Sequence, residues 1–176
     1  MRRHIIFLLI SLLPAVANAN ALSKQISAHA EQTKAKDKEV RCLALNIYHE
    51  ARGEPHDGQL AVAYVTMNRV ASPRYPDSVC EVVWQHRQFS WTHDKYSDIP
   101  SNGRAWAKAL RIANFVYSNY FRFRKITKGA TDMTKGALFY FAPKKVSPYW
   151  IRSMVTTAAI GSHVFLTDTP QTELDG

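Results

Sequence analysis

The chain has 176 residues and carries 23 Lys and Arg against 14 Asp and Glu, which gives a formal net charge of +9 at pH 7. This length supports one domain with a hydrophobic core of its own, and it excludes a small scaffold that depends on metals or many disulfides. The excess of positive charge favours an anionic partner, such as an acidic polymer, nucleic acid or an anionic membrane, and charge alone does not choose among them.

Residues 1–19 have the pattern of an export signal. Arg2 and Arg3 precede an apolar run from Ile5 to Leu13, and small residues with cleavage sites near residues 19–21 follow it. The run is shorter than the about 20 residues that cross a bilayer, so an uncleaved anchor is the lesser alternative. We therefore expect an exported protein, in the periplasm, cell wall or extracellular space, with no stable membrane insertion after cleavage.

Residues 20–38 are polar and rich in Lys, Gln and Ala, and they predict a linker or a weak helix that leads into one domain over residues 39–167. That domain begins with apolar residues at the three-and-four spacing of an amphipathic helix: Val40, Leu43, Ala44, Ile47, Tyr48 and Ala51. Gly53 and Pro55 end this predicted helix.

Three more helices are predicted further along the chain. The second covers residues 57–70 with Asp57 as its N-cap, and a short third covers residues 78–85. After a polar, turn-rich loop over residues 88–103, the longest periodic segment, residues 101–121, predicts the central packing helix.

The C-terminal part of the chain changes character. Residues 137–142 and 163–166 are short, aromatic and β-branched, which predicts two strands that pair as a small β-hairpin. Residues 168–176 are acidic and contain Pro170, so we expect a frayed tail. The predicted fold class is α+β, mainly α-helical.

The two cysteines, Cys42 and Cys80, are expected to form a disulfide in an oxidising compartment. The closed loop of about 38 residues stabilises the fold by on the order of 3–4 kcal/mol in the chain-entropy model. A catalytic thiol is the weaker alternative, because neither cysteine has a histidine beside it. No metal or other cofactor is predicted: His49-Glu50 would need a second His at the position of Gly53 to form a zinc-protease motif.

Glu50 is a carboxylate that ends an otherwise apolar helical stripe. At about 100° per residue it lies about 20° from Leu43 around the helix axis, so its carboxyl borders the buried face. Partial desolvation and the negative end of the helix dipole both raise the pKa of a carboxyl there, which suits a general acid near neutral pH. The alternative is a structural glutamate that pairs with Arg52 or Arg69.

Glycosidic-bond cleavage ordinarily uses two carboxyl groups. One is enough when a hydroxyl of the sugar itself attacks the anomeric carbon, because a single Glu then acts first as acid and later as base. Glu54 lies nearby, but the break at Gly53 leaves its direction open, so it could orient Glu50, bind substrate or cap the next helix. A hydrolytic mechanism would need a second acid, such as Asp57, Asp94 or Asp98.

A sugar-binding groove needs aromatic side chains that stack on sugar faces and polar side chains that bond to hydroxyl groups. The candidates are Gln88, Phe89, Ser90, Trp91, Tyr140, Tyr149, Trp150 and His163. The basic run over residues 122–125 interleaves charge with an aromatic and superficially resembles a nucleic-acid patch. Export makes a solvated or wall-facing surface the better interpretation, so no nucleic-acid partner is expected.

Five segments follow one another between residues 40 and 166: HEARGEP at 49–55, GQLAVAYVTMNRV at 58–70, QFSW at 88–91, GALFYFAP at 136–143 and IGSHVFL at 160–166. Together they resemble the SleB-type cell wall hydrolases, the family of spore-cortex lytic enzymes. The resemblance implies a compact, mostly helical, lysozyme-like domain that cuts peptidoglycan glycan strands between N-acetylmuramic acid and N-acetylglucosamine.

Carried onto this chain, the first Glu of the family's EARGE motif is Glu50, which the resemblance implies is catalytic. The QFSW segment, Tyr140 and His163 would be groove residues. The sequence departs from the family in having no separate peptidoglycan-binding repeat, and the substrate need not be spore cortex. We expect a lytic transglycosylase; a hydrolytic muramidase and a non-catalytic wall-binding module are the alternatives.

Overall fold

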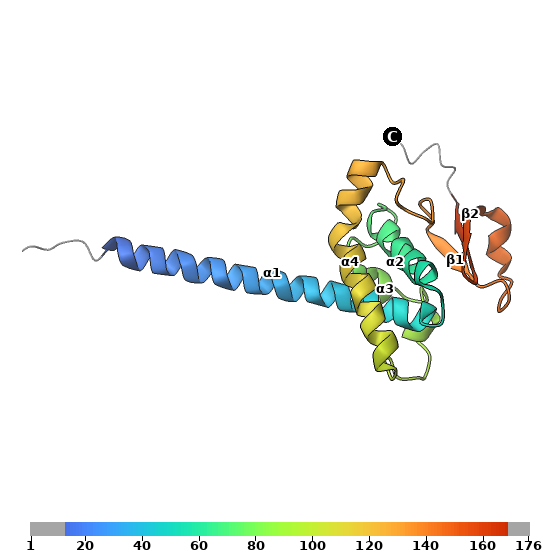
Figure 1. Ribbon diagram of the computed structural model, residues 1–176, viewed down its shortest axis with the longest axis horizontal. Coiled ribbons are helices and arrows are strands. Elements are labelled where there is room, and N and C mark those ends of the chain that lie inside the picture. Colours follow the sequence, from blue (N-terminus) through green and yellow to red (C-terminus); the bar gives the residue numbers. More distant parts are fainter. Residues whose placement is uncertain (1–12, 169–176) are drawn as a thin grey trace, which may run out of the picture. The chain divides into compact units, whose positions relative to one another are not determined.

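The computed structural model describes residues 13–168, and the side chains from residue 20 onward. The elements in chain order are α1 (Leu13–Ala51), α2 (His56–Val70), α3 (Val79–Val83), the 3₁₀ turn η1 (Ser90–Thr92), α4 (Gly103–Thr127), β1 (Phe139–Phe141), the 3₁₀ turn η2 (Tyr149–Ser153), β2 (Val155–Ile160) and β3 (His163–Thr167) (Figure 1). The chain divides into two compact units between Asp37 and Lys38.

The first unit is helical wherever it is described. Helix α1 begins at Leu13, and the side chains of residues 20–38 are exposed. The segment predicted as a linker or weak helix is therefore helical, because Ala, Lys and Gln are strong helix formers even without an apolar face. Most of the predicted signal sequence, residues 1–12, lies outside the described residues. Within residues 13–168 no helix is both long and apolar enough to span a bilayer.

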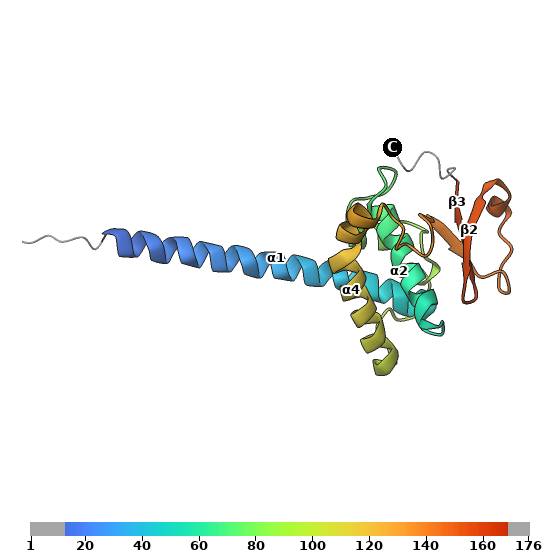
Figure 2. The same cartoon turned by 45° about the horizontal axis from the view of Figure 1, so that its top comes forward.

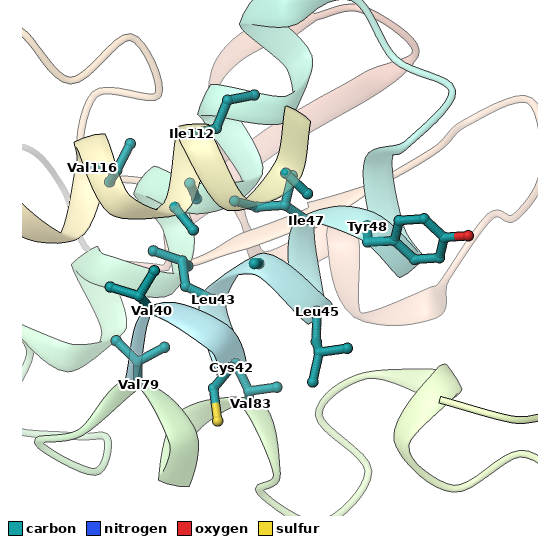
Figure 3. Close-up of a cluster of buried hydrophobic side chains, with 14 of the residues drawn as sticks. Val40, Cys42, Leu43, Leu45, Ile47, Tyr48, Val79, Val83, Ile112 and Val116 are labelled. Atoms are coloured by element: carbon teal, nitrogen blue, oxygen red, sulfur yellow. The ribbon is translucent and has the colours of Figure 1, made fainter. Parts of the chain in front are cut away.

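The core of the second unit forms where the end of α1 meets the other helices. Leu43 and Ile47 of α1 are fully buried, as the predicted stripe requires. Figure 3 shows the α1 side chains between residues of α4, such as Val116, and residues of α3, such as Val79. The disulfide between Cys42 and Cys80 joins α1 to α3, which confirms the predicted pairing.

Helix α2 is buried over most of its length because α4 packs on one side of it and the sheet on the other (Figures 1 and 2). Its predicted N-cap is wrong: Pro55 holds that position without a side-chain hydrogen bond, and Asp57 lies in the first turn. Helix α4 has a side-chain cap, since Asn102 accepts a hydrogen bond from the backbone of Ala105 at 3.0 Å. It continues six residues beyond the predicted end, to Thr127.

The sheet has three antiparallel strands in the order β1-β3-β2. The predicted pairing of β1 with β3 is confirmed, with Phe139 opposite Leu166. Strand β2 was not predicted, and it forms the hairpin with β3. Its sequence, VTTAAI, is weakly amphipathic, and its side chains are exposed or half-buried because it lies at the edge of the sheet.

The predicted frayed tail begins too early. Asp168 forms a bidentate ion pair with Arg74, at 2.7 and 2.8 Å, so residue 168 is held against the domain. Thr167, the last residue of β3, is buried. Residues 169–176, the rest of the predicted tail, lie outside the described residues.

Candidate active site

A cleft of about 620 Å³ opens beside the C-terminal end of α1. Three other segments contribute to its walls: the loop over residues 90–101, the segment from β1 to η2, and the start of β3. The lining residues are Tyr48, His49, Glu50, Arg52, Ser90, Trp91, Asp94, Tyr96, Ser97, Ile99, Ser101, Tyr140, Phe141, Ala142, Lys145, Val146, Pro148, Trp150 and His163. Six predicted site residues are therefore brought together: Glu50, Ser90, Trp91, Tyr140, Trp150 and His163.

Glu50 lies in the last turn of α1 and is half-buried. Burial raises the pKa of its carboxyl, against the opposing influence of the Tyr140 phenol and of the positive charges of Arg69 and Lys145. The pKa of Glu50 is therefore shifted upward, as predicted, and burial is the largest cause. Among the described residues neither Arg52 nor Arg69 forms an ion pair with Glu50. The alternative of a structural glutamate paired with one of these arginines is therefore not supported.

Tyr140 of β1 is the phenol that faces this carboxyl. Its hydroxyl is buried and has no partner at hydrogen-bonding geometry within the described part of the chain. Burial and the charge of Glu50 raise the pKa of Tyr140, so the phenol stays protonated. A neutral hydroxyl beside a carboxyl of raised pKa is an available hydrogen-bond donor or acceptor for a substrate or for Glu50 itself.

Gln88 and Phe89 do not line the cleft, contrary to the groove prediction. Phe89 is buried, and the Arg69 guanidinium lies 5.3 Å from the centre of its ring. With its amide oriented to accept, the Gln88 oxygen lies 2.8 and 3.1 Å from the two terminal nitrogens of Arg69. Arg69 also donates from Nε to the carbonyl of Leu138 at 2.7 Å. The two predicted groove residues therefore hold a buried arginine whose charge acts on Glu50.

Trp91 is both core and cleft residue. Its indole Nε1 donates to Oδ1 of Asn46 at 3.2 Å, inside the protein. Its ring stacks on His49, with 4.4 Å between ring centres, and both residues line the cleft. His49 is further fixed by Nε2, which lies 3.1 Å from the carbonyl oxygen of Asp98. One face of the Trp91 ring is thus covered by His49, and Trp91 is 6% exposed, so the indole presents little surface to the cleft.

Glu54 is not among the residues that line the cleft, and it does not cap α2. Its Oε2 accepts a hydrogen bond from the backbone N–H of Ser162 at 2.8 Å, and its Oε1 accepts from the Ser162 hydroxyl. Burial alone would raise the pKa of Glu54, but the bonds from Ser162, with the charges of His163 and Lys145, outweigh it and lower that pKa. Glu54 therefore anchors the turn between β2 and β3.

His163 follows that turn and reaches the cleft. Its ring lies edge-on to Tyr140, 5.4 Å between centres, and its Nδ1 is 3.8 Å from Oε1 of Glu54. Burial lowers the pKa of His163, with Lys145 acting in the same direction and Glu54 against it. The Nδ1 of His163 is buried without a hydrogen-bond partner among the described residues, and the residue lines the cleft.

Of the three residues suggested as a second acid, only Asp94 lines the cleft. It is exposed, and its Oδ1 accepts a hydrogen bond from the backbone of Tyr96 at 2.8 Å. Asp57 is exposed on the first turn of α2, and Asp98 contributes its backbone carbonyl to His49. Within residues 20–168, Glu50 and Asp94 are the two carboxylates of the cleft.

Several lining residues were not predicted as site residues, among them Tyr48 and Lys145, and only one of two neighbouring aromatic candidates lines the cleft. Tyr48 was assigned to the core stripe, yet its hydroxyl reaches the loop and accepts from the backbone of Asn102 at 3.0 Å. Trp150 lines the cleft, whereas its neighbour Tyr149 is 86% exposed and does not. Lys145 carried no recognisable signal, because surface lysines are common and only the path of the chain after β1 brings this one to the cleft.

The Cell Wall Hydrolase family model matches residues 53–166, so the match begins three residues after Glu50. The spore cortex-lytic enzymes of Bacillus subtilis (strain 168) and Oceanobacillus iheyensis are both 32% identical over 127 residues, which is 72% of this chain and 37% and 41% of those proteins. The chain thus spans less than half the length of these curated relatives.

Two solved structures are similar to this chain. The catalytic domain of the Bacillus cereus SleB protein matches with a TM-score of 0.56 and 30% identity, covering 74% of this chain and 91% of that one. The catalytic domain of the germination-specific lytic transglycosylase SleB from Bacillus anthracis matches with a TM-score of 0.56 and 31% identity, covering 73% and 93%. These matches confirm the predicted mainly helical, lysozyme-like fold with a small sheet.

Proposed function

Because the chain belongs to the cell wall hydrolase family, we propose that it cleaves peptidoglycan between N-acetylmuramic acid and N-acetylglucosamine, with Glu50 as general acid and base. One observation carries the assignment of Glu50: it is the half-buried carboxyl of the cleft, and burial raises its pKa. A raised pKa favours the protonated form of the carboxyl, and in that form Glu50 can protonate a glycosidic oxygen, which is the demanding step of glycoside cleavage.

The reaction we propose is that of a lytic transglycosylase. Glu50 gives its proton to the glycosidic oxygen, and the bond from that oxygen to the muramic acid anomeric carbon breaks. The 6-hydroxyl of the same muramic acid then forms a bond to the anomeric carbon, and the Glu50 carboxylate accepts its proton. No water is consumed, and the product end is a 1,6-anhydro-muramic acid.

Scarcity of carboxylates supports this mechanism over hydrolysis. A hydrolytic muramidase needs a second carboxylate to activate water or to act as nucleophile. Among the described cleft residues Asp94 is the one candidate, and it is exposed with one oxygen bonded to the turn at Tyr96. Glu54, the nearest acid in sequence, is committed to Ser162.

The same proposal places the protein outside the cytoplasm, after removal of residues 1–19. The Cys42–Cys80 disulfide supports this, because such bonds persist in oxidising compartments. The peptidoglycan of the envelope is also an anionic polymer, which suits the remaining chain: without Arg2 and Arg3 it has 21 Lys and Arg against 14 Asp and Glu, a net charge of +7.

Digestion of purified sacculi tests the proposal in one assay. Fragments from a lytic transglycosylase end in anhydro-muramic acid, so they are lighter by one water than hydrolysis products and resist reduction by borohydride. Predominantly reducible ends would instead establish a muramidase. Asp94 would then be the first residue to replace in a search for the second acid. Binding to sacculi without release of fragments would establish a non-catalytic wall-binding module.

A further inference from the structure

Lys145 occupies an unusual place in the cleft. Its backbone is fixed in the turn after β1, since its N–H donates to the carbonyl of Ala142 at 2.9 Å. Its side chain lines the cleft and is exposed. None of the ion pairs found among the described residues involves its ammonium group. The fold thus holds the backbone of Lys145 in place, and its ammonium group has no ion-pair partner among the described residues.

The charge of Lys145 acts on the catalytic side of the cleft. Its electrostatic influence reaches the carboxyls of Glu50 and Glu54 and the imidazole of His163. Lys145 lines the same cleft as Glu50 and His163. Neither carboxyl forms an ion pair with the ammonium among the described residues, and Glu54 is already bonded to Ser162.

With Glu50 protonated, as the proposed reaction requires, the cleft lining has two cations, Arg52 and Lys145, against one carboxylate, Asp94. Arg52, the other cation, lies over the ring of Tyr48 at 5.2 Å and donates to that residue's carbonyl at 3.5 Å. Asp94 on the loop opposite is the one other described acid of the lining and is bonded to the turn. A substrate that carries a negative charge close to the scissile bond would complement this arrangement.

Peptidoglycan offers such a charge. Each N-acetylmuramic acid bears a peptide on its lactyl group, next to the glycosidic bond, and the residues of that peptide carry free carboxylates. We propose that Lys145 forms a carboxylate-binding subsite beside Glu50 that recognises the stem peptide of the muramic acid being cleaved. This inference rests on the proposed function and deepens it: the preferred substrate is a glycan strand that still carries its peptides.

Lysine suits this task better than arginine would. Its ammonium is a compact charge on a flexible stem, whereas a guanidinium favours one planar, two-point geometry. The stem peptide is mobile and has more than one carboxylate. A flexible ammonium can move with these carboxylates, so the motion of the peptide weakens the attraction little. Because Lys145 is exposed, the contribution is that of a partly screened ion pair.

The test compares three forms of the same uncross-linked glycan strands: with stem peptides, with the peptide carboxyls converted to amides, and stripped of peptides by an amidase. The matched variants are Lys145→Ala and Lys144→Ala, because Lys144 is also exposed but does not line the cleft. The quantity measured is kcat/KM for each strand, with kcat and KM separated, at low and high salt.

We expect the wild type to prefer the peptide-bearing strand over the other two by about fivefold, mostly through KM, with a smaller preference at high salt. Lys145→Ala should abolish this preference, and Lys144→Ala should keep it. Equal preference in the wild type and Lys145→Ala, or equal rates on amidated and unmodified peptides, would overturn the subsite. Failure of the wild type to release fragments from any strand would instead refute the proposed function.

Discussion

The last turn of α1 and the turn that follows it carry one glutamate each, four residues apart, and the fold gives the two carboxyls opposite surroundings. Glu50 faces the cleft without an ion-pair partner in the described structure, and burial raises its pKa. Glu54 does not line the cleft, accepts two hydrogen bonds from Ser162, and has a lowered pKa. The same residue type therefore has its protonated form favoured at one position and its charged form favoured at the other.

The difference shows that the role of each carboxyl is set by what its neighbours donate, and not by its place in the sequence motif. A carboxylate that accepts N–H and O–H bonds is stabilised in its charged form, whereas one that is only desolvated is not. Glu54 serves the site indirectly, because the turn that it holds precedes His163 on the cleft wall. In the proposed mechanism Glu50 is the catalytic residue, and Glu54 is a positioning residue.

Replacing each glutamate by glutamine gives the largest expected effect. Glu50→Gln keeps the shape of the side chain but cannot donate the proton, so fragment release from sacculi should fall by roughly a thousandfold or more. Glu54→Gln should keep at least a tenth of the activity, since its carboxyl is not required in the reaction. If Glu50→Gln retains a tenth of wild-type activity, or if the two variants lose equally, the contrast between the two carboxyls is wrong.

Gly161→Ala tests the Glu54 turn without changing a charge. Gly161 has a φ of +61°, and a Cβ there would collide with Oε2 of Glu54. The combined strain should lower the free energy of unfolding by roughly 1–3 kcal/mol. Gly53→Ala is the matched control, because nothing lies within 4 Å of the Cβ position at Gly53. Equal denaturation midpoints for the two alanine variants would show that Glu54 does not pack on the turn.

Stability measurements on the two glutamine variants should give opposite signs. The lowered pKa of Glu54 means that its carboxylate stabilises the fold above the ordinary value of 4.5, a contribution that is lost as the pH falls through the folded pKa. Glu54→Gln should therefore cost about 1 kcal/mol at pH 7, because Ser162 is exposed, and less in acid.

Glu50 behaves in the reverse sense. With its folded pKa raised, its contribution is fully present below 4.5 and is lost as the pH rises through the folded pKa. Glu50→Gln should consequently leave the fold equally stable or more stable at pH 7. Denaturant titrations of both variants at pH 7 and pH 4 measure the two trends. A parallel loss of stability in both variants at pH 7 would mean that Glu50 is also a structural anion.

The sequence predicted the parts of this site that depend on periodicity. The stripe from Val40 to Ala51 placed Glu50 at the edge of the buried face, and the β1–β3 pairing placed Tyr140 and His163 on neighbouring strands. These results follow from regular spacing and strong local preferences. The helical character of residues 20–38 was harder to predict because helix propensity acts there without an apolar pattern.

Side-chain direction in irregular segments could not be predicted. Gln88 and Phe89 turn inward to Arg69, whereas Ser90 and Trp91 face the cleft, and no period separates these consecutive residues. The bond from Glu54 to Ser162 spans 108 positions of the chain, and it exists only because a strand without a clear pattern, β2, completes the hairpin. Long-range polar contacts of this kind depend on the assembled fold.

The smallest expected effect concerns the influence of the Lys145 charge on the pKa of Glu50. The reaction needs Glu50 protonated, so kcat/KM should fall as the pH rises through the pKa of that carboxyl. The positive charges of Lys145 and Arg69 favour the ionised carboxylate and lower this pKa, as does the Tyr140 phenol, while burial raises it. Removing the Lys145 charge should therefore raise the pKa of Glu50 and move the alkaline limb of the pH profile to higher pH.

Lys145→Ala measured on peptide-free glycan strands isolates this effect, because the proposed peptide subsite has nothing to bind there. The shift should be modest, since Lys145 is exposed, and it should shrink as the ionic strength rises. Lys144→Ala should leave the limb where it is, since that side chain does not line the cleft. A limb that stays fixed in Lys145→Ala at low salt, or that moves to lower pH, would show that Glu50 is not the titrating acid. The contrast with Glu54 would then rest on hydrogen bonding alone.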